Sequence, residues 1–557
     1  MLIEDRSTTP DYPPEAPRRW PKRLLVGGIA GLLVAAIAAF VVSAFALSGS
    51  SIEEDGNSLG TVNTDAFGGS VSTVRATAVK SGDDIPVELR GDRIVPTTPL
   101  HPGEQVTVEA IVKRPSTIGF LAGSENKLTM TTTAPSASIE TAWISVKKGK
   151  NPYVHFSTPV SQVAYGQPGK LKHRRFAKPR DSFSLGKQPA AGQMVVAGAP
   201  WGKSMEKLGK FKSVTWFPAT GKPTIAATPM AGSTISASTP IELTFSKPVK
   251  KILGSEKPKL SPEVDGKWSQ PNPHTLRFVP TGFGVPLATD LKVELPEEVE
   301  VVQSDGSVEN ASEVKWEVPA GSEVRLQQML AQLGYLPYKW TGEGVAKTPE
   351  AQVAAATTEA PKGHFSPRWK NTPSGLKELW TPGKANVLQE GALMSFEERN
   401  GLEVDGIAGP VVWESLMKAV IAGEKKPTKG TENGFTWVSV SEDSPEAVTV
   451  WHNGKFVLSG IAANTGIPGA ETELGTHNVY VRYEETTMTG ENPDGSHYND
   501  PGIKWVSYFY EGDALHAFDR ASYGSPQSLG CVEMSLEDAE AVYPYTPIGT
   551  PVTVNPA

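Results

Sequence analysis

Between residues 61 and 319, short apolar runs alternate with polar residues and are broken by glycine, proline and asparagine. Alternation with a period of two residues is typical of strands that bury one face. The string "VHFSTPV" at 154–160 recurs as "LTFSKPV" at 243–249, an offset of 89 residues (243 − 154). A repeat of this length fits a β-sandwich better than a solenoid repeat. The pattern therefore predicts one or two sandwiches over 61–222 and another over 223–319.

These predicted sandwiches resemble the immunoglobulin-like domains of bacterial cell-surface proteins, and the likeness lies in their pattern more than in any motif. A basic stretch, "KLKHRRFAKPR" at 170–180, stands out within them. We interpret it as a solvated loop, and the alternative is a contact with an anionic polymer of the cell wall.

Residues 24–47 form a run of 24 residues without a charged side chain. As a helix this run would be about 36 Å long, enough to cross a hydrocarbon core of roughly 30 Å. It is longer than the apolar part of a secretory signal, so we predict an uncleaved transmembrane helix. A cleaved signal peptide is the alternative, because "AFA" at 44–46 resembles a cleavage site.

Charges flank this run unevenly: Arg18, Arg19, Lys22 and Arg23 precede it, and Glu53, Glu54 and Asp55 follow it. Positive charge stays on the cytoplasmic side of a membrane. We therefore expect residues 1–23 to be a cytoplasmic tail and 48–60 to be an external linker. The predicted location is a cell membrane crossed once, with the bulk of the chain outside the cell at the wall.

Helical periodicity replaces the strand pattern at 320–425. "SEVRLQQMLAQLGYL" at 322–336 and "ALMSFEERNGLEVDGIAGPVVWESLMKAV" at 392–420 predict helices, the last of which begins at Pro410. Their "LQ..L..LGY" and "vDGi.GP.tw..L" strings resemble the three-helix peptidoglycan-binding module. An Ala-, Thr-, Pro- and Lys-rich insertion at about 342–390 departs from that pattern and is predicted to be a flexible loop. The alternative is an ordinary helical linker domain.

The last domain is predicted to span 434–557. "AVTVWHNGKFVLSG" reads as a hairpin that turns at Asn453-Gly454. "THNVYVRY", "IKWVSYFYEGDALHAF" and "TPVTV" predict strands, and "SLEDAEAVY" predicts a helix capped by Ser535. The fold class is thus mainly β and multidomain, with one small helical module and one predicted transmembrane helix.

Composition narrows the choice of function. A chain of 557 residues is too long for one core, so several domains are expected. Its net charge of −8 argues against a general nucleic-acid binder, which would be basic. The sequence contains no closely spaced set of metal-ligating residues, so we expect no metal and no other cofactor.

Cys531 is the only cysteine of the chain. Secreted proteins use cysteines in pairs. A single thiol therefore indicates either an available group, which is reactive or pairs with a partner chain, or a buried apolar side chain. Four histidines lie in the last domain, His452, His477, His497 and His516. His516 ends an apolar strand 15 residues (531 − 516) before the cysteine, and a returning loop would bring both together. This pairing alone leaves both interpretations of the cysteine open.

At these residues the sequence resembles the YkuD-type catalytic domain of the L,D-transpeptidases, which cross-link peptidoglycan. The family pattern is a histidine, a dozen or more residues, and then Ser/Thr-His-Gly-Cys, a hydrophobic residue and Arg or Asn. His516 and the string Ser528, Gly530, Cys531 and Val532 match it. "NTGIPGAETELGTHNVYV" and "PIGTPVTV" match its upstream stretch and closing strand. Leu529 and Glu533 depart from it, the first in place of a histidine and the second in place of Arg or Asn.

The resemblance implies a cysteine-dependent acyltransferase. His516, oriented by the carbonyl of Ala517, would take the proton of Cys531, and the thiolate would attack a stem tetrapeptide. The backbone N–H of Cys531, left accessible by Gly530, would help to bind the oxyanion. A second stem would resolve the thioester and form a 3→3 cross-link.

Ser528 and Tyr508 are further candidates, as hydrogen-bonding groups on the substrate side, although Tyr508 can equally be a packing residue. Glu533 would raise the pKa of the thiol or repel a substrate carboxylate. The implied partners are peptidoglycan stem peptides, a membrane through one helix, and a carbapenem inhibitor. Two alternatives stay open: an L,D-carboxypeptidase or amidase that uses the same cysteine, and an inactive wall-binding surface protein.

Overall fold

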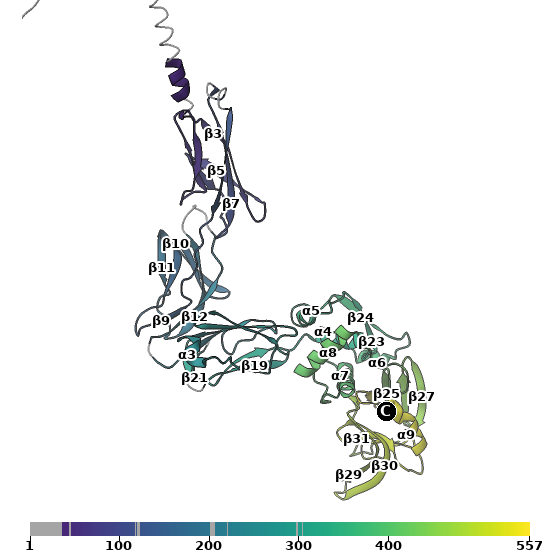
Figure 1. Ribbon diagram of the computed structural model, residues 1–557. Coiled ribbons are helices and arrows are strands. Elements are labelled where there is room, and N and C mark those ends of the chain that lie inside the picture. Colours follow the sequence, from purple (N-terminus) through teal and green to yellow (C-terminus); the bar gives the residue numbers. More distant parts are fainter. Residues whose placement is uncertain are drawn as a thin grey trace, which may run out of the picture. The chain divides into compact units, whose positions relative to one another are not determined.

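The computed structural model describes residues 36–43, 46–116, 119, 123–200, 207–219, 221–296, 299–303 and 305–557. The chain divides into two compact units (Figure 1). Unit 1 consists of Met1–Ile144, Asn151–Lys187 and Met194–Val214. Unit 2 consists of Ser145–Lys150, Gln188–Gln193 and Thr215–Ala557.

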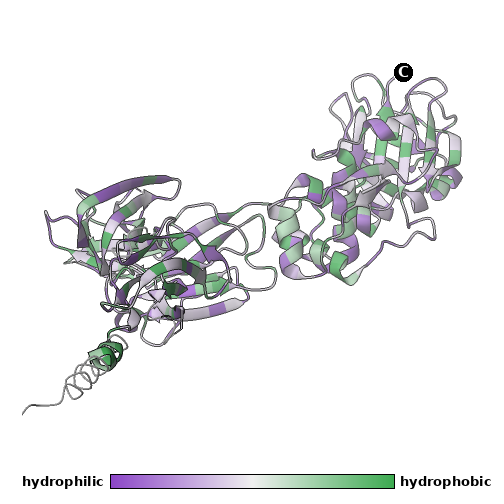
Figure 2. Ribbon diagram, turned by 90° about the horizontal axis from the view of Figure 1, so that it is seen from above, coloured by the Kyte–Doolittle hydropathy of each residue, from purple (hydrophilic) through white to green (hydrophobic). Residues whose placement is uncertain are grey.

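The predicted transmembrane segment lies largely outside the described residues, since only 36–43, 46 and 47 of its 24 residues are described. Residues 36–43 are helical, and Figure 2 colours this short helix as hydrophobic. Within the described residues, no helix has the length and apolar character that a membrane span requires. The membrane anchor therefore stays a prediction.

Unit 1 begins with two antiparallel four-stranded sheets, in the orders β1-β2-β6-β5 and β4-β3-β7-β8. Apolar side chains that alternate along the strands of both sheets form one core, as the sequence pattern predicts. The strands are β1 (Ser50–Glu53), β2 (Gly60–Thr64), β3 (Ser70–Ala78), β4 (Asp84–Ile85), β5 (Val87–Arg90), β6 (Arg93–Pro96), β7 (Gln105–Lys113) and β8 (Glu125–Thr133).

A five-stranded sheet follows, in the order β11-β10-β12-β13-β9. Its strands are β9 (Trp143–Val146), β10 (Tyr153–Gln167), β11 (Lys170–Ser184), β12 (Gly192–Pro200) and β13 (Lys212–Pro218). The interpretation of the basic stretch 170–180 as a loop is wrong, because it forms most of β11. The pairing of β11 with the long strand β10 satisfies its backbone, and its basic side chains remain exposed.

Unit 2 begins with a six-stranded sheet, β17-β18-β15-β14-β20-β21, and a three-stranded sheet, β16-β19-β22, which contribute to one core. Its elements are β14 (Thr224–Thr228), β15 (Ile241–Phe245), α3 (Val249–Leu253), β16 (Leu260–Ser261), β17 (Gly266–Asn272), β18 (Thr275–Pro280), β19 (Thr289–Glu294), β20 (Glu300–Val302), β21 (Val308–Asn310) and β22 (Glu313–Val318). The repeated string at 243–249 falls on β15 and the start of α3.

A helical module comes next, and both predicted helical regions are confirmed. Its elements are α4 (Glu323–Leu333), β23 (Tyr338–Gly342), α5 (Pro349–Thr357), β24 (Gly363–Pro367), α6 (Ser374–Glu378), α7 (Val387–Asn400) and α8 (Pro410–Ala422). The prediction of a flexible loop at 342–390 is wrong, because this stretch contains two helices and a strand. Thr348 caps α5 and Pro349 occupies its first turn, so an alanine-rich sequence becomes helical here.

The C-terminal domain contains two sheets, in the orders β27-β26-β25-β33-β28 and β29-β30-β31-β32. Its elements are β25 (Thr436–Ser441), β26 (Ala447–His452), β27 (Lys455–Ala462), β28 (Gly475–Asn478), β29 (Val481–Glu491), β30 (His497–Tyr510), β31 (Asp513–Ala517), β32 (Val532–Met534), α9 (Leu536–Val542), η1 (Tyr543–Tyr545) and β33 (Pro551–Asn555). The predicted hairpin turn at Asn453-Gly454 is confirmed, with φ of 46° and 88°. "THNVYVRY" forms parts of two strands, β28 and β29.

The helical module packs directly against the C-terminal domain within unit 2. The rings of Trp369 and Trp451 meet edge to face, with centroids 5.1 Å apart. The side chain of Asn478, on β28, donates a hydrogen bond to the carbonyl of Val387 on α7. The apolar side chains of this contact belong to the same core as those of the helical module.

Candidate active site

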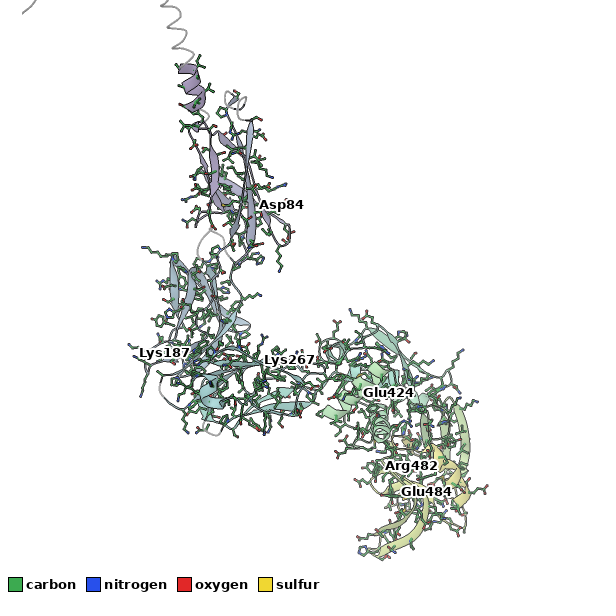
Figure 3. All side chains as sticks on the ribbon, in the orientation of Figure 1. Asp84, Lys187, Lys267, Glu424, Arg482 and Glu484 are labelled. Carbon is green, nitrogen blue, oxygen red and sulfur yellow. The ribbon has the colours of Figure 1, made fainter. Side chains whose placement is uncertain are left out.

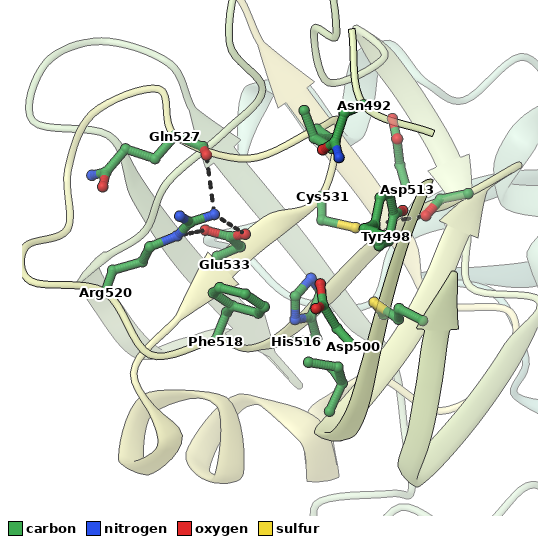
Figure 4. Close-up of a pocket in the computed structure, with 14 residues that line it drawn as sticks. Asn492, Tyr498, Asp500, Asp513, His516, Phe518, Arg520, Gln527, Cys531 and Glu533 are labelled. Atoms are coloured by element: carbon green, nitrogen blue, oxygen red, sulfur yellow. Dashed lines mark hydrogen bonds and ion pairs between the residues drawn. The ribbon is translucent and has the colours of Figure 1, made fainter. Parts of the chain in front are cut away.

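A parallel pair of strands brings Cys531 and His516 to one cavity. β31 pairs with β32 so that His516 stands opposite Glu533, and the 14-residue loop between the strands returns the chain to Cys531. The cavity has a volume of about 340 Å³ and is lined by both residues (Figure 4). The structure therefore places the predicted nucleophile and the predicted base at one site.

The imidazole of His516 is held by the main chain. Its Nδ1 lies 2.9 Å from the carbonyl oxygen of Ala517, the contact that the resemblance implies. A carbonyl only accepts, so Nδ1 carries the proton and Nε2 keeps its lone pair. Burial lowers the pKa of His516, and the Ala517 carbonyl opposes that shift. His516 is thus a neutral base at neutral pH.

The thiol of Cys531 is protonated at rest. Its Sγ lies 3.6 Å from the carbonyl oxygen of Gly512, toward which it donates. Burial raises the pKa of Cys531 to about 12; the charges of Asp513 and Glu533 add to this, and a backbone hydrogen bond from Ala514 opposes it. The expectation that Glu533 raises this pKa is confirmed in direction, with burial as the larger cause.

We expect alkylation of Cys531 by the neutral reagent iodoacetamide to be slow at neutral pH. Because the pKa lies far above neutrality, the rate should rise about tenfold for each step of one in pH, without a plateau below about pH 9. Alkylation is followed by intact mass spectrometry, with Cys531→Ala as the blank. A plateau near neutral pH would instead indicate a preformed thiolate–imidazolium pair.

Gly530 is required by the backbone itself. Its φ is +109°, and a Cβ added there would lie 2.3 Å from Oδ1 of Asp513. The sequence suggested that this glycine leaves room for substrate; the structure adds a steric reason on the protein side.

Gly530→Ala should destabilise the C-terminal domain by about 2 kcal/mol, since a strained non-glycine residue costs on the order of 1–3 kcal/mol. Calorimetric unfolding measures the effect. Gly512→Ala is the matched control, because an added Cβ at Gly512 meets nothing within 4 Å. Equal stability of the two variants would contradict the steric argument.

Glu533 does not face the cavity as a bare charge. Arg520 donates to it through Nε and Nη2, each 2.8 Å from a carboxylate oxygen, and Nη2 also donates to the carbonyl of Gln527 (Figure 4). The guanidinium lies 4.6 Å from the centre of the Phe518 ring. Glu533 is buried and Arg520 lines the cavity beside it. The negative charge that replaces the Arg or Asn of the family pattern is therefore paired with a cation of the same cavity.

The two weaker candidates occupy different positions. Ser528 is buried, and its hydroxyl donates to the carbonyl of Cys531 at 2.5 Å. It therefore supports the cysteine turn with its O–H group, and its role toward a substrate stays a prediction. Tyr508 is half-buried and packs against the small apolar cluster that Cys531 also contacts. Burial and the nearby thiol raise the pKa of Tyr508 to about 12, so it stays a donor.

Of the histidines of the C-terminal domain, only His516 lines the described cavity. The ring of His477 packs on Tyr510, and His497 is exposed at the start of β30. His452 is half-buried, with Nδ1 2.8 Å from Oγ1 of Thr436. Its place beside the hairpin turn predicts exposure, which is wrong, because its ring packs against that of Tyr545, with centroids 5.2 Å apart.

Sequence reasoning missed six polar residues of the cavity: Asn492, Tyr498, Asp500, Asp513, Arg520 and Gln527. Burial raises the pKa of Asp513 to about 6, and its Oδ2 accepts from the backbone N–H of Glu473 at 3.0 Å. The only signal for Asp513 was its place at the start of the strand that ends near His516. In the described part of the chain, no group of three or more His, Cys, Asp or Glu side chains is arranged to hold a metal.

A thiol beside a neutral, main-chain-anchored imidazole defines a cysteine acyl-transfer site. Residues 436–554 match the family model of the L,D-transpeptidase catalytic domain, YkuD. This part of the chain is thus an L,D-transpeptidase catalytic domain. The resemblance of this domain is confirmed, whereas the immunoglobulin-like and peptidoglycan-binding modules stay predictions.

Three solved structures illustrate what the chain is similar to. An L,D-transpeptidase from Mycobacterium smegmatis is 12% identical over 60% of this chain and 100% of that chain, with a TM-score of 0.20. L,D-transpeptidase 3 from Mycobacterium tuberculosis, in complex with a faropenem-derived adduct, is 13% identical over 60% of this chain and 98% of that chain, with a TM-score of 0.20. The catalytic domain from the E. faecium L,D-transpeptidase is 24% identical over 22% of this chain and 96% of that chain, with a TM-score of 0.20. No curated protein matches the chain.

Proposed function

We propose that the protein forms 3→3 cross-links in peptidoglycan through a thioester on Cys531. The observation that carries this proposal is the shared cavity in which the Cys531 thiol meets His516, whose Nδ1 is bound by the Ala517 carbonyl. That contact leaves Nε2 as the only ring nitrogen able to accept a proton.

In the first step, Nε2 of His516 takes the proton of the thiol as Sγ attacks the carbonyl before the terminal D-residue of a donor stem. The backbone N–H of Cys531 stabilises the oxyanion. The C–N bond then breaks, the proton of His516 passes to the leaving amine of D-alanine, and the acyl group stays on Sγ as a thioester.

In the second step, the side-chain amine of an acceptor stem attacks the thioester. His516 removes one proton from this amine and returns it to Sγ as the C–S bond breaks. An amide between the third residues of two stems is formed, and the free thiol is restored. The high pKa of Cys531 makes transfer of the proton during attack, rather than before it, the consistent order.

The proposal extends to the place of the protein. The apolar run at 24–47 anchors the chain in the cell membrane, and the modules that follow place the catalytic domain at the wall. The module at 320–425 binds peptidoglycan and raises the local concentration of stems. The acyl-enzyme chemistry also makes a carbapenem an inhibitor of Cys531.

Product analysis tests the reaction. The full-length protein is incubated with purified disaccharide-tetrapeptide, and the products are separated by mass. A cross-linked dimer that has lost one D-alanine supports the proposal. Shortened monomer without dimer would instead show a carboxypeptidase, and unchanged substrate would show an inactive domain.

A further inference from the structure

A second cavity lies in the helical module, apart from the Cys531 site. Its volume is about 410 Å³, within the range of small-ligand sites. It is lined by residues of α4, of the segment before α5, of α5 itself and of the chain just after α8, where Glu424 is labelled in Figure 3. The proposed catalytic steps use none of these residues.

Arg325, on α4, lines this cavity although it is fully buried. Its Nη1 donates to Oε1 of Gln328 at 3.3 Å and its Nη2 to Oε1 of Gln352 at 2.6 Å. Its Nε has no hydrogen-bond partner in the described part of the chain. Among the described residues, no carboxylate forms an ion pair with it. Burial lowers the pKa of Arg325 to about 10, so the group is still charged at neutral pH.

A buried guanidinium without a counter-charge is unfavourable unless a ligand supplies one. Arg368, in the same module, shows the structural alternative: it donates to the backbone carbonyls of Leu336 and Ala331. Two donors of Arg368 therefore satisfy backbone carbonyls of the module. The Nε of Arg325 satisfies no carbonyl among the described residues.

Gln332 adds an unpaired acceptor to the same cavity. Its Oε1 is buried and has no hydrogen-bond partner among the residues that the structure describes. Gln332 lines the same cavity as Arg325. Two residues that line one cavity therefore each carry a buried polar atom without a hydrogen-bond partner among the described residues. Their complement is a ligand that carries an anionic acceptor and an N–H or O–H donor close together.

The charges that line the cavity favour an anion. Lys347 and Lys425 stand against a single carboxylate, Glu424. Burial, together with the charges of Arg368 and Lys347, lowers the pKa of Lys425, as expected where cations crowd. A neutral glycan offers hydroxyl groups but no charge to compensate Arg325.

We propose that this cavity binds a carboxylate-bearing peptide, the stem peptide of peptidoglycan. The peptide carboxylate accepts from Arg325, and a neighbouring amide N–H donates to Oε1 of Gln332. This choice of ligand rests on the proposed function, which makes such peptides the substrate. The module would then hold stems by their peptide part.

Hydrogen–deuterium exchange of the full chain tests the site. The Cys531→Ala variant is used so that no turnover occurs, and a free stem tetrapeptide is the probe. We expect slower exchange at 343–356 and 420–426, at least fivefold in the most affected amides. The same peptide with its carboxylates converted to amides should give no protection there.

Arg325→Gln and Gln332→Leu, each in the Cys531→Ala background, should remove this protection and leave any protection at 512–531 unchanged. Gln332→Leu keeps the test valid if Arg325→Gln fails to fold. Lys339→Gln, an exposed change on β23, is the control and should keep it. Two results would overturn the inference. One is protection at 343–356 that persists in both variants, and the other is equal protection by the amidated peptide.

The two proposals fail separately. A wild-type protein that makes no dimer, but whose Cys531→Ala form shows carboxylate-dependent protection at 343–356, would refute the proposed reaction and keep the cavity as a peptide site. Cross-linking without any protection at 343–356 would refute the site and keep the reaction.

Discussion

Full-length protein incubated with a carbapenem will gain the mass of one inhibitor molecule, and the Cys531→Ala variant will gain none. The thiol is partly exposed, lies in a cavity of about 340 Å³ and is the only cysteine of the chain. In the proposed mechanism His516 is the neutral base, so attack on the strained lactam carbonyl needs no preformed thiolate. Intact mass spectrometry measures the adduct.

Cys531→Ala should form no adduct at all. His516→Ala should be acylated about 10²-fold or more slowly, as expected when a general base is removed. Ser528→Ala is a useful comparison, because the hydroxyl of Ser528 donates to the carbonyl of Cys531. It should slow acylation less than His516→Ala does. An adduct that persists without Cys531 would exclude this thiol as the nucleophile.

The local elements of the C-terminal domain could be predicted because short-range signals decide them. Asn453-Gly454 makes its turn, and the hydroxyl of Ser535 accepts from the backbone N–H of Asp538 at the start of α9. The meeting of His516 and Cys531 was predicted through the resemblance to a family. The 15-residue spacing alone permitted it without requiring it.

What the sequence could not provide depends on contacts between distant residues. Nothing local to Glu533 indicates that Arg520, 13 residues earlier, pairs with it, so the charge at 533 was read as unfavourable. The stretch 342–390 was read as a loop from its composition. Its fold depends on packing, such as Leu376 in the core and the stacked rings of Tyr338 and Trp380, 4.6 Å apart.

The Arg520–Glu533 pair gives the second large prediction. Arg520→Gln leaves the buried carboxylate of Glu533 without its partner, and breaking a buried pair costs several kcal/mol. Because the side chain of Arg520 is 31% exposed, we expect a smaller loss, about 2 kcal/mol in the free energy of unfolding. Glu533→Gln should cost less, since Arg520 can turn toward water.

The two variants should shift the reactivity of Cys531 in opposite directions. Glu533 is one of the charges that raise the pKa of the thiol. Without the cation of Arg520, its effect on the thiol grows, so the pH profile of acylation moves to higher pH and the rate at neutral pH falls. Without the carboxylate, one of the charges that raise the pKa of the thiol is removed, so the profile moves to lower pH.

The double variant Arg520→Gln, Glu533→Gln is the matched control. It leaves no unpaired charge, so it should recover most of the stability lost in Arg520→Gln, and the coupling between the two sites can be read from the cycle. Stability comes from calorimetry, and the pH profile comes from carbapenem acylation followed by mass. Shifts of the same sign in both single variants would show that the pair acts on the fold alone. Opposite shifts of the pH profile would mean that Arg520, in the loop between β31 and β32, offsets the effect of the Glu533 charge on the thiol.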